Sequence, residues 1–180
     1  NTDEFTQNKI NQYKQNKSHL PNIIDIKTLN QHIFPRIIIE DKTFMSKSFD
    51  YNESWYPPGH ANIYDILIED GIAQDLLNRG IEYVFISNVD NLAATIDTNI
   101  IYHMINNEID FIMEVTKKTI NDVKGGTLIN YQNKLTLFEF VQCPPDKINQ
   151  FQDIDKFRIF NTNNLWISIK SIIDNYSPSR

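Results

Sequence analysis

The sequence predicts an α/β fold in which helices pack on a mostly parallel, mixed sheet. Short β-branched and aromatic runs alternate along the chain with segments whose apolar residues recur at helical spacing, as this class requires. The clearest strand signal is Tyr83-Val84-Phe85-Ile86, an apolar run typical of a strand buried on both faces in a parallel sheet. Because 180 residues with 41% hydrophobic side chains can fill one core, we expect a single domain over residues 1–180.

The amino-terminal part of the chain predicts helices and two short strands. Residues 2–14 begin with acidic side chains after a threonine and space their apolar residues among polar ones, which predicts a capped surface helix. The β-branched runs at 23–26 and 37–39 predict two strands around a loop, whereas residues 41–53 show no period and predict a loop. Apolar positions over residues 63–77 are interrupted at Gly71, which predicts two helices joined by a turn.

The remaining sequence predicts further alternation of strands and helices. We expect a strand at 83–86, a helix over 96–106, a strand over 111–115 and a hairpin that pairs 127–129 with 135–138. Residues 148–155 look helical, residues 157–160 extended, and residues 165–173 mixed.

Charge and composition argue against several classes of protein. The formal net charge is -6 and the basic residues are scattered, whereas nucleic-acid-binding domains usually carry a basic surplus or a basic face. No run of about 18 apolar residues predicts a membrane span, and the first residues do not resemble a secretory signal. The single cysteine, Cys143, excludes an internal disulfide and fits a reducing compartment, so we expect a cytoplasmic protein.

Polar residues follow the buried strand 83–86 directly. The carboxyl ends of such strands are where open α/β sheets bind ligands. Asp90 is therefore a candidate ligand for Mg²⁺, which usually takes one or two protein carboxylates together with phosphates and waters. The alternative is that Asp90 caps the next helix. Asn88 could bond a sugar hydroxyl or the chain itself.

Other candidate residues have two interpretations each from the pattern alone. Gly59 follows two prolines in a shaped turn where a ligand could approach the backbone, and the neighbouring His60 could be structural or functional. The pair Gly125-Gly126 could form a bulge or a contact surface. Glu139 interrupts an apolar strand, so its carboxylate either faces solvent or needs a buried partner.

Several common catalytic patterns are not found in the sequence. It contains no Gly-x-Gly and no Gly-x-x-x-x-Gly-Lys for holding phosphates. The four histidines lie in unrelated contexts, without zinc spacing or a nucleophile set. We therefore assign no catalytic residue from the sequence.

Four motifs occur in a fixed order. They are Trp55-Tyr56-Pro57-Pro58-Gly59-His60, Ser87-Asn88-Val89-Asp90-Asn91-Leu92, Asp122-Val123-Lys124-Gly125-Gly126-Thr127 and Phe160-Asn161-Thr162-Asn163-Asn164-Leu165-Trp166. With them the chain resembles the eukaryotic-type UTP-glucose-1-phosphate uridylyltransferases from about Asn1 to about Ile173. The resemblance implies the central part of a Rossmann-like (GT-A-like) nucleotidyltransferase domain, truncated at both ends. The family's glycine-rich nucleotide loop would precede it, and a catalytic lysine and a β-helical domain would follow.

The resemblance also implies roles for individual residues. The implied reaction joins UTP and glucose 1-phosphate to give UDP-glucose and pyrophosphate, with Mg²⁺ as cofactor and Asp90 beside the metal. Gln31 and Gly59 would bind the uracil. The residues implied to bind the sugar phosphate are His60, Asn88, Gly125, Gly126, Glu139 and Asn161.

The chain departs from the family pattern at three positions. Ala61 and Asn62 stand where the family has glycine and aspartate, and Ala93 replaces another glycine. These departures keep a non-enzymatic alternative open, a shortened and degenerate relative that acts as a binding or scaffold protein on a larger assembly. We expect the 180-residue chain by itself to be inactive, and a protein partner to cover its exposed surface.

Overall fold

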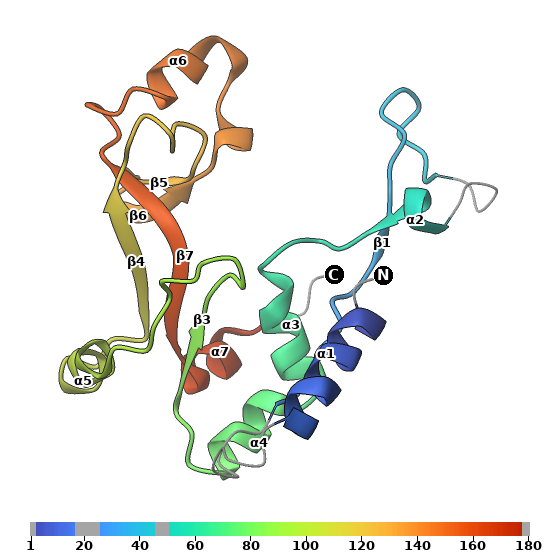
Figure 1. Ribbon diagram of the computed structural model, residues 1–180. Helices are drawn as coiled ribbons and strands as arrows, with labels where there is room; N and C mark the ends of the chain where they lie inside the picture. Colours follow the sequence, from blue (N-terminus) through green and yellow to red (C-terminus); the bar gives the residue numbers. More distant parts are fainter. Residues whose placement is uncertain (1–2, 17–25, 46–50, 178–180) are drawn as a thin grey trace. The chain divides into compact units, whose positions relative to one another are not determined.

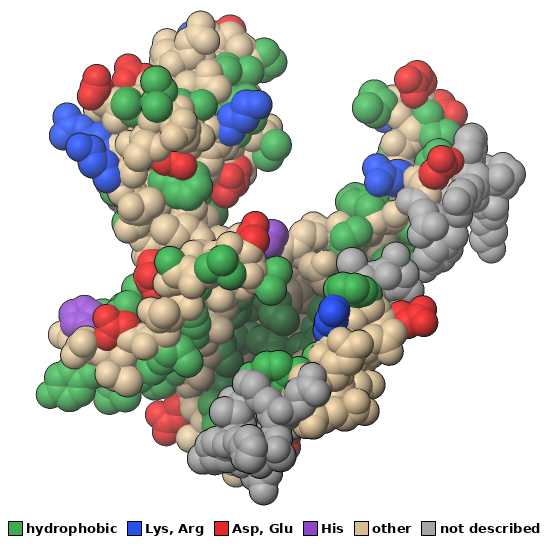
Figure 2. Space-filling view, in the orientation of Figure 1, with side chains coloured by type: hydrophobic (Ala, Val, Ile, Leu, Met, Phe, Trp, Pro, Cys, Tyr) green, Lys and Arg blue, Asp and Glu red, His purple; other side chains and the backbone are tan. Residues whose placement is uncertain are grey.

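The computed structural model describes residues 3–16, 26–45 and 51–177, which divide into two compact units (Figure 1). The first unit comprises Asn1–Ile72 with Tyr176–Arg180, and the second comprises Ala73–Asn175. The single domain expected from the sequence stays a prediction. Within the described residues, no helix has the length and apolar character needed to span a bilayer. On the face drawn in Figure 2, basic side chains lie dispersed among acidic and neutral ones.

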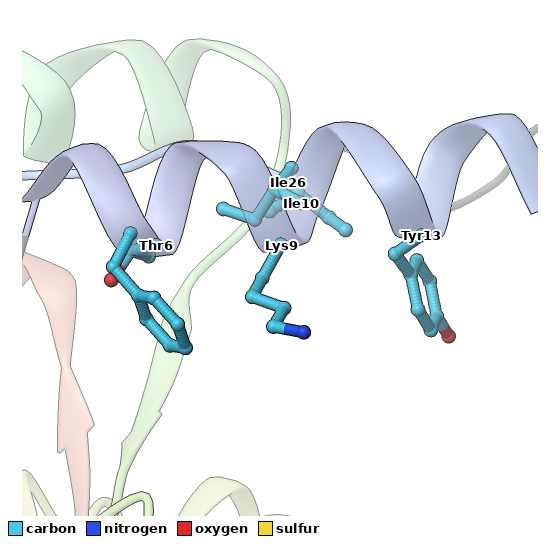
Figure 3. Close-up of a pocket in the computed structure, with 6 residues that line it drawn as sticks. Thr6, Lys9, Ile10, Tyr13 and Ile26 are labelled. Carbon is cyan, nitrogen blue, oxygen red and sulfur yellow. The ribbon is translucent and has the colours of Figure 1, made fainter.

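The first unit begins with the predicted surface helix, α1 (Asp3–Asn16). Acidic residues occupy its first turn and Lys14 its last, so both ends complement the helix dipole. With Ile26, the helix forms an open apolar groove of about 380 Å³ (Figure 3). The groove is lined by Phe5, Thr6, Lys9, Ile10, Tyr13 and Ile26.

A small sheet and a turn follow in the first unit. Strands β1 (Phe34–Pro35) and β2 (Trp55–Tyr56) pair antiparallel, with helix α2 (Tyr51–Ser54) just before β2. The strand predicted at 37–39 is wrong, because only Ile37 forms a bridge, to Phe44. The chain reverses near Lys42, whose φ is 57°. The Asp41 carboxylate stabilises this turn because it accepts a hydrogen bond from the backbone N–H of Thr43. Of the strand predicted at 23–26, residues 23–25 lie outside the described residues.

The predicted helix pair is confirmed. Helix α3 (Asn62–Glu69) ends just before Gly71, and α4 (Ile72–Asn78) begins just after it. Two residues of α3, Ile66 and Leu67, are buried as the helical spacing requires. Helix α4 leads into the second unit.

The main sheet of the second unit is antiparallel, so the predicted mostly parallel sheet is not confirmed. Its order is β3 (Tyr83–Ile86), β7 (Ile159–Ser168) and β4 (Phe111–Lys117), and both neighbouring pairs are antiparallel (Figure 1). Strands β3 and β4, joined through helix α5 (Thr98–Asn106), run in the same direction, but β7 lies between them. The apolar run of β3 predicted a parallel neighbour, and the order of strands is not contained in that pattern.

Strand β7 includes residues 161–164, for which the sequence predicted no structure, and residues 165–168, for which the prediction was mixed. It is ten residues long and passes directly into α7 (Ile169–Asn175). Asparagine is depleted in strands, which is why the segment 161–164 did not predict one. The register against β4 shifts between Met113 and Val115, and Asn163 has a φ of 58°. The strand is held in place by the core residue Trp166, whose ring centroid lies 4.3 Å from that of Phe85.

A hairpin and short helices complete the second unit. The predicted hairpin is confirmed as β5 (Thr127–Tyr131) and β6 (Lys134–Phe138), joined through Gln132 and Asn133 at positive φ. It is followed by the 3-10 turns η1 (Phe140–Gln142) and η2 (Pro145–Lys147) and by α6 (Ile148–Phe151), which is shorter than predicted. Phe151 is buried among the rings of Phe138, Phe140 and Phe157.

Candidate substrate-binding site

The glycine pair before β5 packs directly against two other candidate residues. A Cβ added at Gly125 would lie 1.8 Å from the nearest ring atom of Phe160, and one added at Gly126 would lie 2.4 Å from Glu139 Oε1. A side chain at either position would have to displace the neighbouring side chain, so glycine permits this close approach. The carbonyl oxygen of Gly126 accepts a hydrogen bond of 2.9 Å from the backbone N–H of Asn161. Residues far apart in sequence therefore meet at one place in the second unit.

The position of Glu139 is fixed by the turn that follows β6. Its backbone N–H donates to Gln142 Oε1 at 2.8 Å, and its carbonyl oxygen accepts from the Gln142 amide at 2.9 Å. These bonds hold the backbone of Glu139 while its half-buried carboxylate lies against Gly126. The Glu139 carboxylate is thus turned toward the glycine pair.

Lys118 is a buried residue near this place that the sequence analysis missed. It is 2% exposed, and its Nζ lies 3.4 Å from the Gly125 oxygen and 3.5 Å from the Phe151 oxygen. The ammonium group also lies 4.5 Å from the centre of the Phe151 ring. Burial lowers the pKa of Lys118, and the charge of Asp122 opposes this shift. A lysine directly after a strand whose last residues are exposed gave no sequence signal, because its burial depends on contacts with Gly125 and Phe151.

Asparagines of β7 connect this place with the loop that follows β3. The backbone N–H of Asn163 donates to Asn161 Oδ1 at 2.8 Å, and the side-chain Nδ2 of Asn163 donates to Asn88 Oδ1 at 2.7 Å. The sugar-phosphate candidates Asn88, Gly125, Gly126, Glu139 and Asn161 therefore form one continuous set of contacts.

A second series of hydrogen bonds connects the same loop to strands β7 and β4. Asn91 Nδ2 donates to Asn164 Oδ1 at 3.2 Å, and Asn164 Nδ2 donates to Glu114 Oε2 at 3.2 Å. The other carboxylate oxygen of Glu114 accepts from Trp166 Nε1 at 2.6 Å. The sequence analysis gave no role to Glu114 or Asn164, because their pairing depends on the register of β4 and β7.

Asp90 lies exposed in this loop, two residues beyond Asn88. It does not cap the next helix, because α5 begins at Thr98 and its cap is Asp97, which accepts from the Asn99 amide at 2.8 Å. Among the residues that the structure describes, no three His, Cys, Asp or Glu side chains lie together so that they could hold a metal ion. Asp90 is thus a single exposed carboxylate at the end of a strand.

In the first unit, the two residues implied to bind uracil contact each other. Gln31 Nε2 donates to the Gly59 carbonyl oxygen at 3.0 Å. Gly59 has a φ of 110°, a left-handed conformation that favours glycine. His60 follows it and is exposed. The residues Gln31, Gly59 and His60 belong to the first unit and the other candidates to the second.

Asn62, one of the departures from the family pattern, turns inward. It is buried, its Oδ1 accepts from the His32 amide at 2.9 Å, and its Nδ2 donates to His32 Nδ1 at 3.1 Å. His32 Nε2 lies 3.4 Å from Glu69 Oε2, and Glu69 also accepts from the Tyr176 hydroxyl at 2.9 Å. The hydrogen bond to Glu69, together with burial, raises the pKa of Tyr176. Asn62 therefore holds the residue next to Gln31.

The two alanine replacements fit their surroundings. Ala61 has φ -62° and ψ -19°, an ordinary helical conformation that does not need glycine. Ala93 is exposed. Neither replacement strains the backbone of the described residues.

Comparisons with known proteins identify the family of the chain. The family model for UTP-glucose-1-phosphate uridylyltransferase matches residues 1–179. The enzyme of that name from Musa acuminata is 44% identical over 173 residues, covering 96% of this chain and 36% of the relative. A probable one from Schizosaccharomyces pombe is 42% identical over 183 residues, covering 99% of this chain and 35% of the relative.

Solved structures give the same result. UDP-glucose phosphorylase from Trypanosoma brucei superposes with a TM-score of 0.84 at 33% identity, covering 95% of this chain and 38% of that one. A point mutant of UDP-glucose pyrophosphorylase from Leishmania major, in complex with UDP-glucose, gives 0.72 at 37% identity, covering 80% and 33%. The chain thus spans about a third of the length of its relatives. Because the family model matches nearly its whole length, the chain belongs to the UTP-glucose-1-phosphate uridylyltransferase family.

Proposed function

We propose that this chain forms the UDP-glucose-binding part of an enzyme that transfers a uridylyl group from UTP to glucose 1-phosphate. The observation that carries the proposal is the convergence of Gly125, Gly126, Glu139 and Asn161 in the second unit. Family membership supports it, as does the Leishmania major relative solved with UDP-glucose.

The second unit has the chemistry to bind a sugar. A carboxylate accepts hydrogen bonds from sugar hydroxyls, and the amides of Asn161 and Asn88 can donate or accept. The glycine pair brings the backbone close without side chains in the way. We assign Glu139, Asn161, Gly125, Gly126 and Asn88 to the glucose and its phosphate.

The first unit supplies groups suited to a uracil edge, which carries a donor between two acceptors. One Nε2 hydrogen of Gln31 is used by the Gly59 oxygen, so its Oε1 and second hydrogen remain for the paired contact that the base requires. Gly59 leaves space for the ring, and we place His60 near the sugar phosphate.

We assign Asp90 to a magnesium ion. A single exposed carboxylate fits Mg²⁺, because this ion takes most of its remaining ligands from phosphates and waters. When bound, the ion would neutralise charge that grows on phosphate oxygens during transfer. The side chains of the second unit would meanwhile orient the sugar phosphate for in-line attack.

For the 180-residue chain by itself, we propose binding without turnover. None of its residues forms the Gly-x-Gly type of phosphate loop, and positioning of the triphosphate supplies much of the rate in such transfers. The second candidate, a non-catalytic binding or scaffold relative, rests on Ala61, Asn62 and Ala93. We further propose a cytoplasmic location and a protein partner over exposed apolar surface such as the α1 groove.

The test is pyrophosphate release from UTP, glucose 1-phosphate and Mg²⁺ by the complete natural protein. We expect turnover that Asp90→Ala removes, and that the control Asp75→Ala, an exposed aspartate paired with Arg79, leaves unchanged. The 180-residue chain assayed alone should show none. Binding of UDP-glucose without turnover by the complete protein would favour the non-catalytic relative, and neither binding nor turnover would refute both proposals.

A further inference from the structure

We propose that Asn62 is a positioning residue that holds Gln31 against Gly59, and that it does so while His32 is a neutral imidazole with its proton on Nε2. The inference rests on the proposed function, because it takes Gln31 and Gly59 as the residues that bind uracil. Neither Asn62 nor His32 is assigned a contact with the ligand, so both would act through their neighbours.

Hydrogen bonds through Asn62 form a closed series beside the two uracil residues. The Gly59 carbonyl oxygen accepts from Gln31 Nε2 at 3.0 Å and from the backbone N–H of Asn62 at 3.3 Å. The side-chain Oδ1 of Asn62 accepts at 2.9 Å from the backbone N–H of His32, which belongs to the peptide unit that follows Gln31. Because Asn62 is 4% exposed, water competes little for these bonds. The backbone and the side chain of Gln31 are thus both tied to one buried residue.

The neighbours of the Asn62 side-chain amide decide its orientation. The backbone N–H of His32 can only donate, so the atom of Asn62 that receives this bond is the oxygen. The other atom is therefore Nδ2, which donates at 3.2 Å to the Asp65 carboxylate. The same Nδ2 lies 3.1 Å from His32 Nδ1. Nδ1 must then be the acceptor, and the proton of the neutral ring lies on Nε2.

A proton added to His32 would oppose this arrangement. It would place an N–H on Nδ1, facing the Nδ2 hydrogens of Asn62. Rotation of the Asn62 amide by half a turn would satisfy Nδ1 but would turn Nδ2 toward the His32 backbone N–H. In either orientation two donors face each other, so the hold on Gln31 weakens.

The titratable groups that face His32 come from α3 and from the residue after α7. Glu69 Oε2 lies 3.4 Å from His32 Nε2, and Asp65 reaches the ring through Asn62. Tyr176 donates to Glu69, and because this hydrogen bond raises the pKa of Tyr176, its hydroxyl keeps its proton. Glu69 favours a protonated His32, but the two side chains are 48% and 39% exposed, so solvent screens the attraction. The buried amide of Asn62 therefore has the larger effect.

The experiment measures UDP-glucose affinity by calorimetry in the complete natural protein, from about pH 8 to about pH 5.5, where imidazoles titrate. The variant is Asn62→Asp, whose carboxylate still accepts from the His32 backbone N–H but needs a donor at Nδ1. We expect wild-type affinity, relative to that of Asn62→Asp, to fall roughly two- to tenfold as the pH falls, the range for one hydrogen bond between neutral groups. His60 is present in both proteins, so its own titration cancels in this ratio.

The matched control is Asn107→Asp. Asn107 Nδ2 lies at the same distance, 3.1 Å, from His103 Nδ1, on an exposed helix surface. This variant should keep the wild-type pH profile. Parallel pH profiles for wild type and Asn62→Asp would overturn the proposal.

Nitrogen NMR of the His32 ring gives a second measurement that needs no ligand. In the neutral ring, Nδ1 should carry no proton in wild type and should carry one in Asn62→Asp. A proton on Nδ1 in neutral wild type would reject the proposal even if UDP-glucose binds. If the complete protein binds no UDP-glucose at any pH, the proposed function fails together with the role at a uracil site, and only the His32 tautomer stands.

Discussion

The ammonium group of Lys118 lies 3.4 Å from the carbonyl oxygen of Gly125, in a position where the lysine is 2% exposed. No described carboxylate forms an ion pair with it, so its charge is stabilised by carbonyl oxygens and by the ring of Phe151. A buried cation of this kind costs stability unless it is well bonded. The bond to the Gly125 oxygen fixes the backbone next to Gly126, which packs against Glu139.

We expect Lys118→Met to weaken UDP-glucose binding about threefold or more while changing the free energy of unfolding by less than about 1 kcal/mol. Methionine fills a similar volume and has no charge to desolvate, so the free energy of unfolding should change little although hydrogen bonds are lost. The Gly125 backbone, however, loses the group that holds it. Calorimetry and urea unfolding measure the two effects. Lys117→Met, at the exposed neighbour on β4, is the control. Wild-type affinity in Lys118→Met would contradict this role.

The lowered pKa of Lys118 predicts a pH dependence of stability. In the folded state the lysine loses its proton more easily than in the unfolded state, where its pKa is about 10.5. Between the two pKa values the unfolded state binds more protons, so its contribution to stability rises with pH in this window and is constant below it. Urea unfolding from pH 7 to about 10 should show a rise in wild type that Lys118→Met lacks. Parallel profiles for the two proteins would exclude the effect.

We expect Gly126→Ala to lower UDP-glucose affinity, because the new methyl group would displace the Glu139 carboxylate. Glu139 can move only by leaving the place where it meets the ligand, and a loss of about tenfold corresponds to about 1.4 kcal/mol. The control is Gly80→Ala, which has a φ of 78° but open space around it. It should lower stability by roughly 1 kcal/mol through strain and leave affinity unchanged. Equal affinity of Gly126→Ala and wild type would show that Glu139 does not bind the sugar.

We expect His32→Ala to weaken UDP and UDP-glucose binding by the same factor, since His32 acts on the nucleotide side through the adjacent Gln31. Loss of the imidazole leaves the buried Asn62 Nδ2 with one partner fewer, which costs about 1 kcal/mol of stability. His103→Ala is the control, because His103 makes the same type of contact, to Asn107 at 3.1 Å, on an exposed helix surface. A loss specific to UDP-glucose would argue for a different role of His32.

Local patterns in the sequence predicted the individual elements better than their arrangement. The helices α1, α3, α4 and α5 and the β5–β6 hairpin follow from spacing and turn residues. The position of β7 between β3 and β4 does not follow from any local pattern. Residues 161–164 are rich in asparagine, which is depleted in strands, so they did not predict a strand. The identity of β7 as a strand depends on pairing with two partners distant in sequence.

The candidate site shows the same division. The residues Gly125, Gly126, Glu139 and Asn161 were predicted from motifs, and the structure brings them together. Lys118 and Glu114, which lie near these residues, were missed, and Asn62 of the first unit was misread. Glu114 lies on β4 and Lys118 directly follows that strand, and Asn62 was read as a departure from the family pattern that keeps a non-enzymatic alternative open, although it is 4% exposed and bonded to His32. Burial of a polar side chain depends on tertiary contacts that no local pattern contains.

Calorimetric titration of the complete natural protein with UDP-glucose and with ADP-glucose tests the central claim most directly. The two ligands share the sugar and the diphosphate and differ only in the nucleoside, so the comparison separates recognition of uracil from general affinity for phosphate. We expect UDP-glucose to bind at least about tenfold more tightly, because Gln31 and Gly59 offer a paired amide contact that suits a uracil edge. Equal binding of the two ligands, or no binding of UDP-glucose, would contradict the assignment.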